Sequence, residues 1–146
     1  MSKRFGLIAA AAVVMLAGGM VNNAKAQTLV LTDVQYTPAG GGQKAKTDPK
    51  GTMSLPGDGA TYRVFCDYGT FVNGSFVPDG TVSAGGASAQ NFVSRVGGNH
   101  NWTSAAVHEL NNVPAGLHCR ARLQKWNVQN TTWDSLNGTD QYKSIP

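Results

Sequence analysis

Histidine and carboxylate side chains are the first groups to consider for metal binding or acid–base chemistry. The chain has three histidines, His100, His108 and His118, and eight Asp and Glu residues. A zinc site usually has ligands at short, regular spacing, and none of the histidines has such a partner. The carboxylates are scattered singly along the chain, so a glycosidase pair would arise only through tertiary folding. We predict no metal ligand and no cofactor, and keep a small secreted hydrolase or metal-dependent enzyme, using His100 and His108, as an alternative.

Ser88 is the next candidate for a catalytic group, since it lies in the small-residue stretch GASAQ at 86–90. The nucleophile elbow of α/β-hydrolases has a glycine two residues after its serine. Gln90 occupies that place in this sequence. We therefore predict no catalytic residue and expect a protein that is not an enzyme.

The two cysteines, Cys66 and Cys119, lie 53 positions apart. Two thiols are too few for a structural zinc site, which usually takes four ligands. In an exported chain, an even number of cysteines indicates a disulfide. Closing a loop of this length stabilises a domain by about 4 kcal/mol in the chain-entropy model. We therefore predict a disulfide between Cys66 and Cys119.

Two tryptophans and two arginines form the candidate binding group of the sequence. A polar turn around residue 129 joins two strand-like stretches, and centring the turn there places Trp126 opposite Trp133. Arg120 and Arg122 lie on the same solvent-facing side as Trp126, in the first of these two strand-like stretches. Indole rings beside guanidinium groups can hold sugar rings or a protein partner. A cross-strand tryptophan pair can equally clamp a hairpin, so both roles stay open for Trp126, Trp133, Arg120 and Arg122.

Short β-strands must position these side chains, because most of the sequence alternates between apolar stretches and Gly or Asn turns. The clearest strand is 117–125, where apolar and polar residues alternate as in a strand with one buried face. Further strand-like stretches lie at 28–36, 61–68, 91–96 and 132–143. Many short strands and no long helix predict an all-β fold.

Alternation also assigns side chains to faces. In the first strand-like stretch we expect Val30 and Val34 on one face, and Leu29 and Leu31 on the other. Four residues share a face with one of the cysteines and should lie in the core: Val64, Leu117, Ala121 and Leu123. The Asn-Gly pair at 73–74, between apolar pairs, predicts a β-hairpin.

Residues 37–51 show no apolar periodicity, and they contain three consecutive glycines at 40–42 and several lysines. We expect a Gly/Lys-rich loop here. The glycines do not form a phosphate loop, because no Gly-Lys-Ser or Gly-Lys-Thr follows them.

Residues 1–26 are typical of a secretory signal peptide. Lys3 and Arg4 precede an apolar run that extends to Val21, and AKA at 24–26 is the small-x-small pattern of a cleavage site. We expect cleavage there to leave one domain over 27–146, in the periplasm or outside the cell, without a stable membrane anchor.

Cleavage also changes the charge of the protein. The 12 Lys and Arg fall to 9, against 8 Asp and Glu, so the net charge falls from +4 to +1. A protein that binds nucleic acid needs a concentrated basic surface. We therefore expect no nucleic-acid partner.

The stretch VPAGLHCRAR at 113–122 resembles the penultimate strand of bacterial extracellular immunoglobulin-like domains, and more narrowly that of the cell-adhesion-related CARDB domain. Three other stretches are similar to that family in the expected order: LVLTDV at 29–34, CDYGT at 66–70 and SLNGTD at 135–140. The resemblance implies an immunoglobulin-like antiparallel β-sandwich of about seven strands. In such a fold, the Cys66–Cys119 disulfide would join the two sheets.

The broad role of that family is adhesion or spacing at cell surfaces, and no catalytic residues are carried over with it. The resemblance implies a secreted or periplasmic, non-catalytic binding or structural module with a protein or glycan partner. Self-association is compatible with such a role. A secreted enzyme inhibitor is a further alternative, since small disulfide-bonded domains often have that function.

Overall fold

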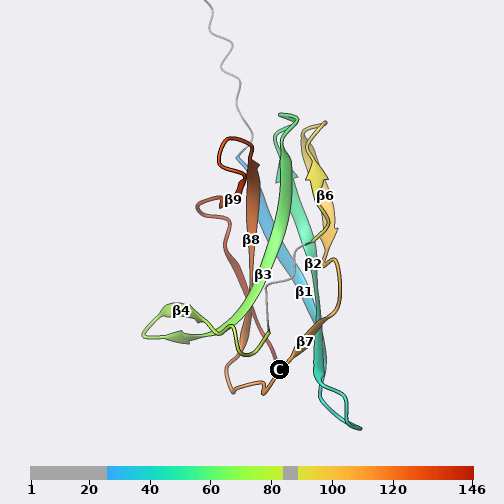
Figure 1. The fold of residues 1–146 in the computed structure, drawn as a ribbon, viewed down its shortest axis with the longest axis vertical. Helices are drawn as coiled ribbons and strands as arrows, with labels where there is room; N and C mark the ends of the chain where they lie inside the picture. The colour runs from blue at the N-terminus through green and yellow to red at the C-terminus, as the bar shows by residue number, and fades with distance from the viewer. Residues whose placement is uncertain (1–25, 84–88) are drawn as a thin grey trace, which may run out of the picture.

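The computed structural model describes residues 26–83 and 89–146, which form strands and connecting turns (Figure 1). The expected signal peptide, apart from Ala26, lies outside the described residues, and so does Ser88. No helix in the described ranges is long and apolar enough to cross a membrane. The strands form two antiparallel sheets, which confirms the all-β prediction.

The smaller sheet has four strands and is built around β2 (Ala45–Leu55). β1 (Thr28–Thr37) pairs with one edge of β2 along nearly its whole length. The other edge of β2 pairs first with β6 (Gly98–Thr103) and then, nearer its start, with β7 (His108–Leu110).

The larger sheet is centred on two long strands that pair with each other, β3 (Thr61–Val72) and β8 (His118–Asn127). Each of them also pairs with two short strands. β3 pairs with β4 (Ser75–Pro78) and β5 (Phe92–Val93), and β8 pairs with β9 (Thr132–Ser135) and β10 (Gln141–Ser144). The described residues thus hold ten strands, several of them very short, where the sequence resemblance implied about seven.

Side chains from both sheets form one hydrophobic core. The four residues predicted to share a face with the cysteines are all fully buried, which confirms the alternation of the two long strands: Val64, Leu117, Ala121 and Leu123. Burying each such aliphatic side chain contributes about 1.5–3 kcal/mol. The smaller sheet contributes Leu29, Leu31, Met53, Leu55 and Trp102 to the same core. This shared core holds the larger sheet in place and leaves its other face toward solvent.

The face assignment predicted for β1 is wrong in its second half. Val30 lies on the face opposite Leu29 and Leu31, as predicted, and is exposed, but Val34 is buried on the side of Leu29 and Leu31. The register with β2 shifts between Leu31 and Asp33. A β-bulge inserts one extra residue at this point, so the alternation restarts and Val34 turns to the core.

The loop predicted over 37–51 is also wrong from Ala45 onward, where β2 begins. Inward positions of β2 are filled by residues such as Pro49 and Gly51, which carry no apolar pattern. Gly51 is required there, because a Cβ at this position would lie 1.9 Å from the Val30 carbonyl oxygen. Pro49 falls opposite the gap between β6 and β7, so its missing N–H removes no ladder bond.

The predicted bridge between two sheets is contradicted by the strand pairing. Cys66 lies on β3 and Cys119 on β8, and these strands are neighbours in one sheet. Cys66 lies opposite Ala121, and Tyr68 lies opposite Cys119, so the two cysteines are diagonal neighbours on the inner face. Their side chains lie 4.4 Å apart and are not bonded. The alternation placed both cysteines in the core but did not identify which strands pair.

The single strand predicted over 132–143 is two strands, β9 and β10, that pair with different halves of β8. The chain turns between them at Gly138, which has a φ of 75°. The predicted cross-strand register of the hairpin is confirmed, since Trp126 lies opposite Trp133. The β8–β9 hairpin therefore presents both indoles on one face of the larger sheet.

The hairpin predicted from the Asn-Gly pair is confirmed between β3 and β4. Asn73 and Gly74 both have positive φ, 50° and 78°, as a type I′ turn requires. Phe71 and Phe76 are paired across this turn. The hairpin projects sideways from the body of the molecule, as Figure 1 shows at β4.

Candidate functional site

The side chains of the larger sheet that point away from the core form a surface that we call the outer face, with β3 and β8 at its centre. The pairing of the two strands brings alternating residues together: Arg63 opposite Gln124, Phe65 opposite Arg122, and Asp67 opposite Arg120. All six side chains are at least partly buried. Cross-strand neighbours on one face interact directly, so the outer face is a continuous set of contacts.

An ion-pair cluster occupies the middle of the outer face. Arg120 donates two hydrogen bonds to the Asp67 carboxylate, and the Arg122 guanidinium lies 3.5 Å from the same carboxylate. The two arginine side chains are only 13% and 21% exposed. Burial raises the pKa of Asp67, although the Arg120 contact opposes this effect. The predicted binding arginines thus have their charge largely satisfied within the protein.

The two indoles and Arg63 form what we call the tryptophan end of the outer face. The rings of Trp126 and Trp133 have centroids 5.3 Å apart and are tilted by 58°. The Arg63 guanidinium carbon lies 4.3 Å from the Trp133 ring centroid, a cation–π contact. Arg63 Nε also donates a 2.8 Å hydrogen bond to Gln124 Oε1. Both indoles are half-buried, so this end is well fixed.

Four aromatic rings form the phenylalanine end, defined as Phe71, Phe76, Tyr142 and His118. Phe71 contacts the other three rings, with centroids 5.0–5.7 Å apart. The Arg120 guanidinium carbon lies 4.5 Å from the Phe76 centroid, which joins this end to the ion-pair cluster. Phe71 is 43% exposed and Tyr142 is 42% exposed. This end therefore presents a packed but open aromatic surface.

All four candidate binding residues lie on the outer face, but they belong to different parts of it. Trp126 and Trp133 form one end, and Arg120 and Arg122 belong to the central ion-pair cluster. Sequence reasoning missed six residues of the face: Arg63, Phe65, Asp67, Phe71, Phe76 and Tyr142. The sequence contained two signals for these residues, the alternation of 61–68 and the predicted hairpin. Neither signal shows that β3, β8 and β10 are neighbours, and this pairing is what brings the residues together.

The three histidines lie in separate parts of the fold. His100 lies opposite Met53 and His108 opposite Thr47 on β2, six positions apart. At about 3.3 Å per residue, this separates them by about 20 Å. His118 lies on the other sheet, against Phe71. The enzyme site considered for His100 and His108 is therefore not formed by this pair.

A chain of buried polar side chains connects the two sheets within the core. The Tyr68 hydroxyl contacts Thr47 Oγ1 at 2.6 Å and His108 Nδ1 at 2.5 Å. His108 Nε2 has no hydrogen-bond partner among the described residues. Burial lowers the pKa of His108, an effect that Asp48 opposes, and burial raises the pKa of Tyr68. This link therefore joins the sheets through uncharged groups.

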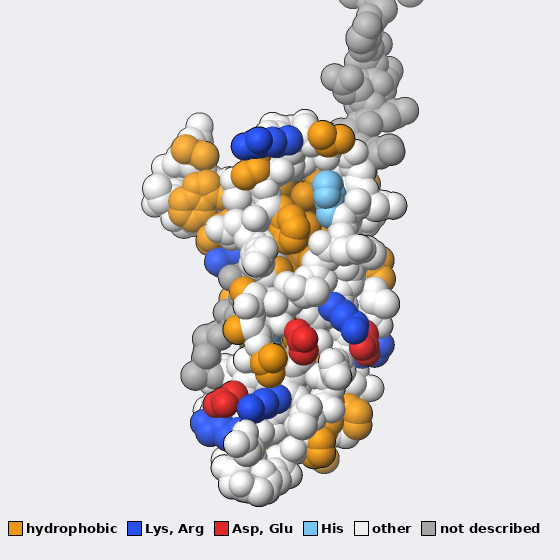
Figure 2. Space-filling model, turned by 90° about the vertical axis from the view of Figure 1, so that its right-hand side faces the viewer, with side chains coloured by type: hydrophobic (Ala, Val, Ile, Leu, Met, Phe, Trp, Pro, Cys, Tyr) orange, Lys and Arg blue, Asp and Glu red, His pale blue; other side chains and the backbone are white. Residues whose placement is uncertain are grey.

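Charged side chains are dispersed on the side of the molecule shown in Figure 2, where basic and acidic residues lie beside one another. The described side chains of this view form no continuous basic surface of the kind that binds nucleic acid. Residues 26–83 and 89–146 also contain no group of three or more His, Cys, Asp or Glu placed to hold a metal ion.

In comparisons with known proteins, no family model, no curated protein and no solved structure matches the chain.

Proposed function

We propose that the protein is an exported, non-catalytic binding module that holds a protein partner at the phenylalanine end of the outer face. The exposure of this end carries the proposal. Phe71 and Tyr142 remain more than 40% exposed although both contact other aromatic rings. Contiguous apolar surface on a small exported protein usually marks an interaction site, and aromatic side chains dominate the centres of protein interfaces.

The chemistry around this end favours an uncharged, apolar partner surface. Phe76 lies opposite Phe71 on the same hairpin and adds a second ring to this surface. Residues 71–78 contain no charged side chain. The nearest guanidinium, that of Arg120, is neutralised by Asp67. Such a surface offers few hydrogen-bonding groups to a glycan and no free charge to a polyanion, so we commit to a protein as the partner.

The tryptophan end has a supporting role in this proposal. Trp126 and Trp133 are half-buried and stack against each other, and Arg63 covers Trp133. An aromatic cross-strand pair stabilises a hairpin by about 0.5–1.5 kcal/mol beyond its buried area. These contacts hold the β8–β9 hairpin and fix the end of β8, which in turn carries Arg120 and His118.

We further propose that cleavage after Ala26 releases the domain outside the cytoplasm and that Cys66 and Cys119 become oxidised there. The thiols are fully buried and 4.4 Å apart, so a modest movement of two adjacent strands would bring the sulfurs to bonding distance. The bridge would tie β3 to β8 within one sheet. The sequence resemblance and the two antiparallel sheets support an immunoglobulin-like adhesion domain as the family.

Intact mass of the exported protein tests both of these points. The protein should begin at Gln27 and should weigh two hydrogen atoms less than its reduced form. A retained N-terminus would contradict the export proposal, and two thiols that alkylate after unfolding without reductant would contradict the bridge.

The binding proposal is tested with variants of two exposed apolar residues. Proteins captured by the immobilised mature domain are purified singly, and their affinity is measured for Phe71→Ser and Val96→Ser. Phe71 lies at the centre of the phenylalanine end, and its loss should weaken binding about tenfold. Val96 is 72% exposed but lies on another part of the molecule, so its change should alter affinity less than about twofold.

Equal losses in the two variants would contradict the proposed surface. Light scattering of the mature domain distinguishes a second copy from a different protein. A dimer that Phe71→Ser dissociates would replace the proposed partner with the chain itself. Selective binding of glycans that Phe71→Ser leaves unchanged would also overturn the proposal.

A further inference from the structure

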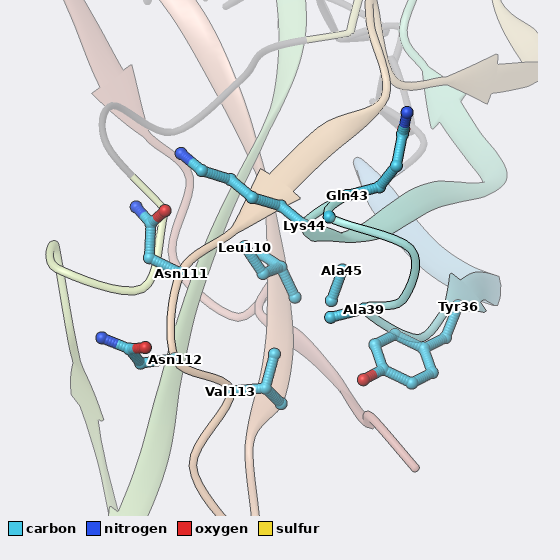
Figure 3. Close-up of a pocket in the computed structure, with 10 residues that line it drawn as sticks. Tyr36, Ala39, Gln43, Lys44, Ala45, Leu110, Asn111, Asn112 and Val113 are labelled. Atoms are coloured by element: carbon cyan, nitrogen blue, oxygen red, sulfur yellow. The ribbon is translucent and has the colours of Figure 1, made fainter.

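A hollow lies beside the turn that joins β1 and β2 (Figure 3). This turn is at the end of the molecule away from the β8–β9 hairpin (Figure 1). Its volume is about 670 Å³, within the range of small-ligand sites. The lining comes from three segments: the end of β1, the turn and start of β2, and the end of β7 with the residues that follow it. This hollow shares no residue with the outer face.

The floor of the hollow is apolar. Ala45 and Leu110 lie opposite each other in the β2–β7 pairing and are each 2% exposed, so they form the buried base of this floor and belong to the core. Val113 and Ala39 extend this floor, as Figure 3 shows. The floor is therefore built on a strand pair of the smaller sheet rather than on loops alone, and it offers a fixed surface to a compact apolar group.

Polar groups without a protein partner surround this floor. Tyr36 Oη, Lys44 Nζ and the Asn112 side-chain amide make no hydrogen bond or ion pair to any other described residue. The neighbouring Lys46 differs, since its ammonium group donates to Gln43 Oε1 at 3.2 Å. In Figure 3 the Lys44 side chain reaches across the hollow toward Asn111, and Tyr36 lies on the opposite side.

The lining of the hollow carries positive charge only. Lys44 is its charged residue, and the ten lining residues include no Asp or Glu. A cation would therefore meet like charge and no ligand carboxylate. A phosphate would meet one ammonium group and none of the arginine forks that usually bind it bidentately. A single carboxylate matches this lining better, because one ammonium and neutral hydrogen-bond donors suffice for it.

We propose that this hollow binds a carboxylate carried on a compact apolar body. The carboxylate pairs with Lys44 and accepts a hydrogen bond from the Asn112 amide, and the apolar body rests on Ala39 and Val113. Two sources share this chemistry: a free short-chain monocarboxylate, and the C-terminal residue of a peptide with an aliphatic side chain. The site is independent of the partner surface on the outer face.

The test is an NMR titration of the isotope-labelled mature protein with N-acetyl-leucine and with its C-terminal amide, which lacks the charge. N-acetyl-leucine should shift the backbone amides of Ala45, Leu110 and Val113, with a dissociation constant of about 1 mM. Lys44→Gln should weaken binding about fivefold or more. Lys46→Gln is the matched control and should change binding less than about twofold.

Two further ligands separate the sources of the carboxylate. Isovalerate that binds as well as N-acetyl-leucine assigns the site to free monocarboxylates. A tripeptide ending in leucine that binds about tenfold more tightly than isovalerate assigns it to peptide C-termini. Equal binding of N-acetyl-leucine and its amide, an unchanged affinity in Lys44→Gln, or no shifts at about 50 mM ligand would each overturn the proposal.

Discussion

The two ends of the outer face contain the same kinds of side chain and differ in how much of them is covered. At each end an arginine stacks on an aromatic ring: Arg63 on Trp133, and Arg120 on Phe76. The indoles are half-buried, and Arg63 is fixed by Gln124. The phenylalanine end leaves Phe71 more than 40% exposed. Similar chemistry therefore covers the rings of a hairpin at one end and leaves an aromatic surface exposed at the other.

The difference follows from the strands that carry each end. Trp126 and Trp133 face each other across β8 and β9, so each ring covers the other. Phe71 and Phe76 lie on a hairpin that projects beyond the body of the molecule. Residue type alone does not distinguish the two situations, and this is why a clamp and a binding surface both remained open for the tryptophans.

The largest effect is expected from Asp67→Asn, because Asp67 holds the arginines between the two ends. Loss of the carboxylate leaves Arg120 and Arg122 partly buried without their partner. Breaking a buried ion pair costs about 3–5 kcal/mol, and partial exposure reduces the expected loss to about 2–3 kcal/mol. Urea unfolding of the variant measures this loss.

Asp140→Asn is the control for this change. Asp140 also faces Arg120, but at 3.9 Å and with a more exposed side chain. Its replacement should cost less than about 1 kcal/mol. Equal costs for Asp67→Asn and Asp140→Asn would show that the central ion pair does not hold the two ends in place.

Trp133→Ala should cost about 1–3 kcal/mol, as is typical for a half-buried aromatic side chain with fixed neighbours. The change also removes the ring under Arg63. Trp133→Phe should recover much of the lost stability, since it keeps an aromatic ring in the pair. If Trp133→Ala leaves the urea midpoint unchanged, the tryptophan end is not a clamp.

A change of pH should act on the core beneath the outer face rather than on either end. Burial holds the pKa of His108 below the ordinary value of 6.5. The unfolded chain therefore binds a proton more readily than the folded one, and stability should fall as the pH drops from 7.5 toward 5. One such group gives at most about 1.4 kcal/mol per pH unit.

His108→Gln should flatten the dependence of the unfolding free energy on pH in this window. His118→Gln, at the phenylalanine end, is the control and should leave the dependence in place. A pH dependence that survives in His108→Gln would assign the effect to groups other than the link between the sheets.

The smallest effect on stability is expected from Phe71→Ser. This side chain is 43% exposed on a projecting hairpin, so its loss should change the unfolding free energy by about 0.5 kcal/mol. A loss of about 2 kcal/mol or more would mean that the phenylalanine end is part of the stabilising structure. The urea midpoint of the variant, compared with that of Trp133→Ala, decides between these outcomes.

The sequence predicts those strands in which apolar and polar residue types alternate. Leu117, Ala121 and Leu123 alternate with polar residues, and their burial follows directly. β2 could not be predicted from residue types, because Pro49 and Gly51 are not typical core residues. They are buried because they lie between β1 and the β6–β7 edge. A pattern of residue types cannot predict burial that is caused by the neighbouring strands.

The candidate site was predictable only in part for a similar reason. A local hairpin fixes the Trp126–Trp133 pair, so short-range register was enough to find it. The phenylalanine end requires β10, which joins β8 and brings Tyr142 to Phe71. The diagonal contact of Cys66 and Cys119 likewise depends on long-range pairing, which alternation within each strand does not reveal.

The most direct test of this account measures both unfolding free energy and partner affinity for Trp133→Ala and Phe71→Ser. Trp133→Ala should lose about 1–3 kcal/mol of stability, and its folded fraction should bind with unchanged affinity. Phe71→Ser should keep its stability within about 0.5 kcal/mol and lose about tenfold in affinity. If both variants lose affinity equally at full stability, the outer face is one binding surface and the division into a clamp and a docking end is wrong.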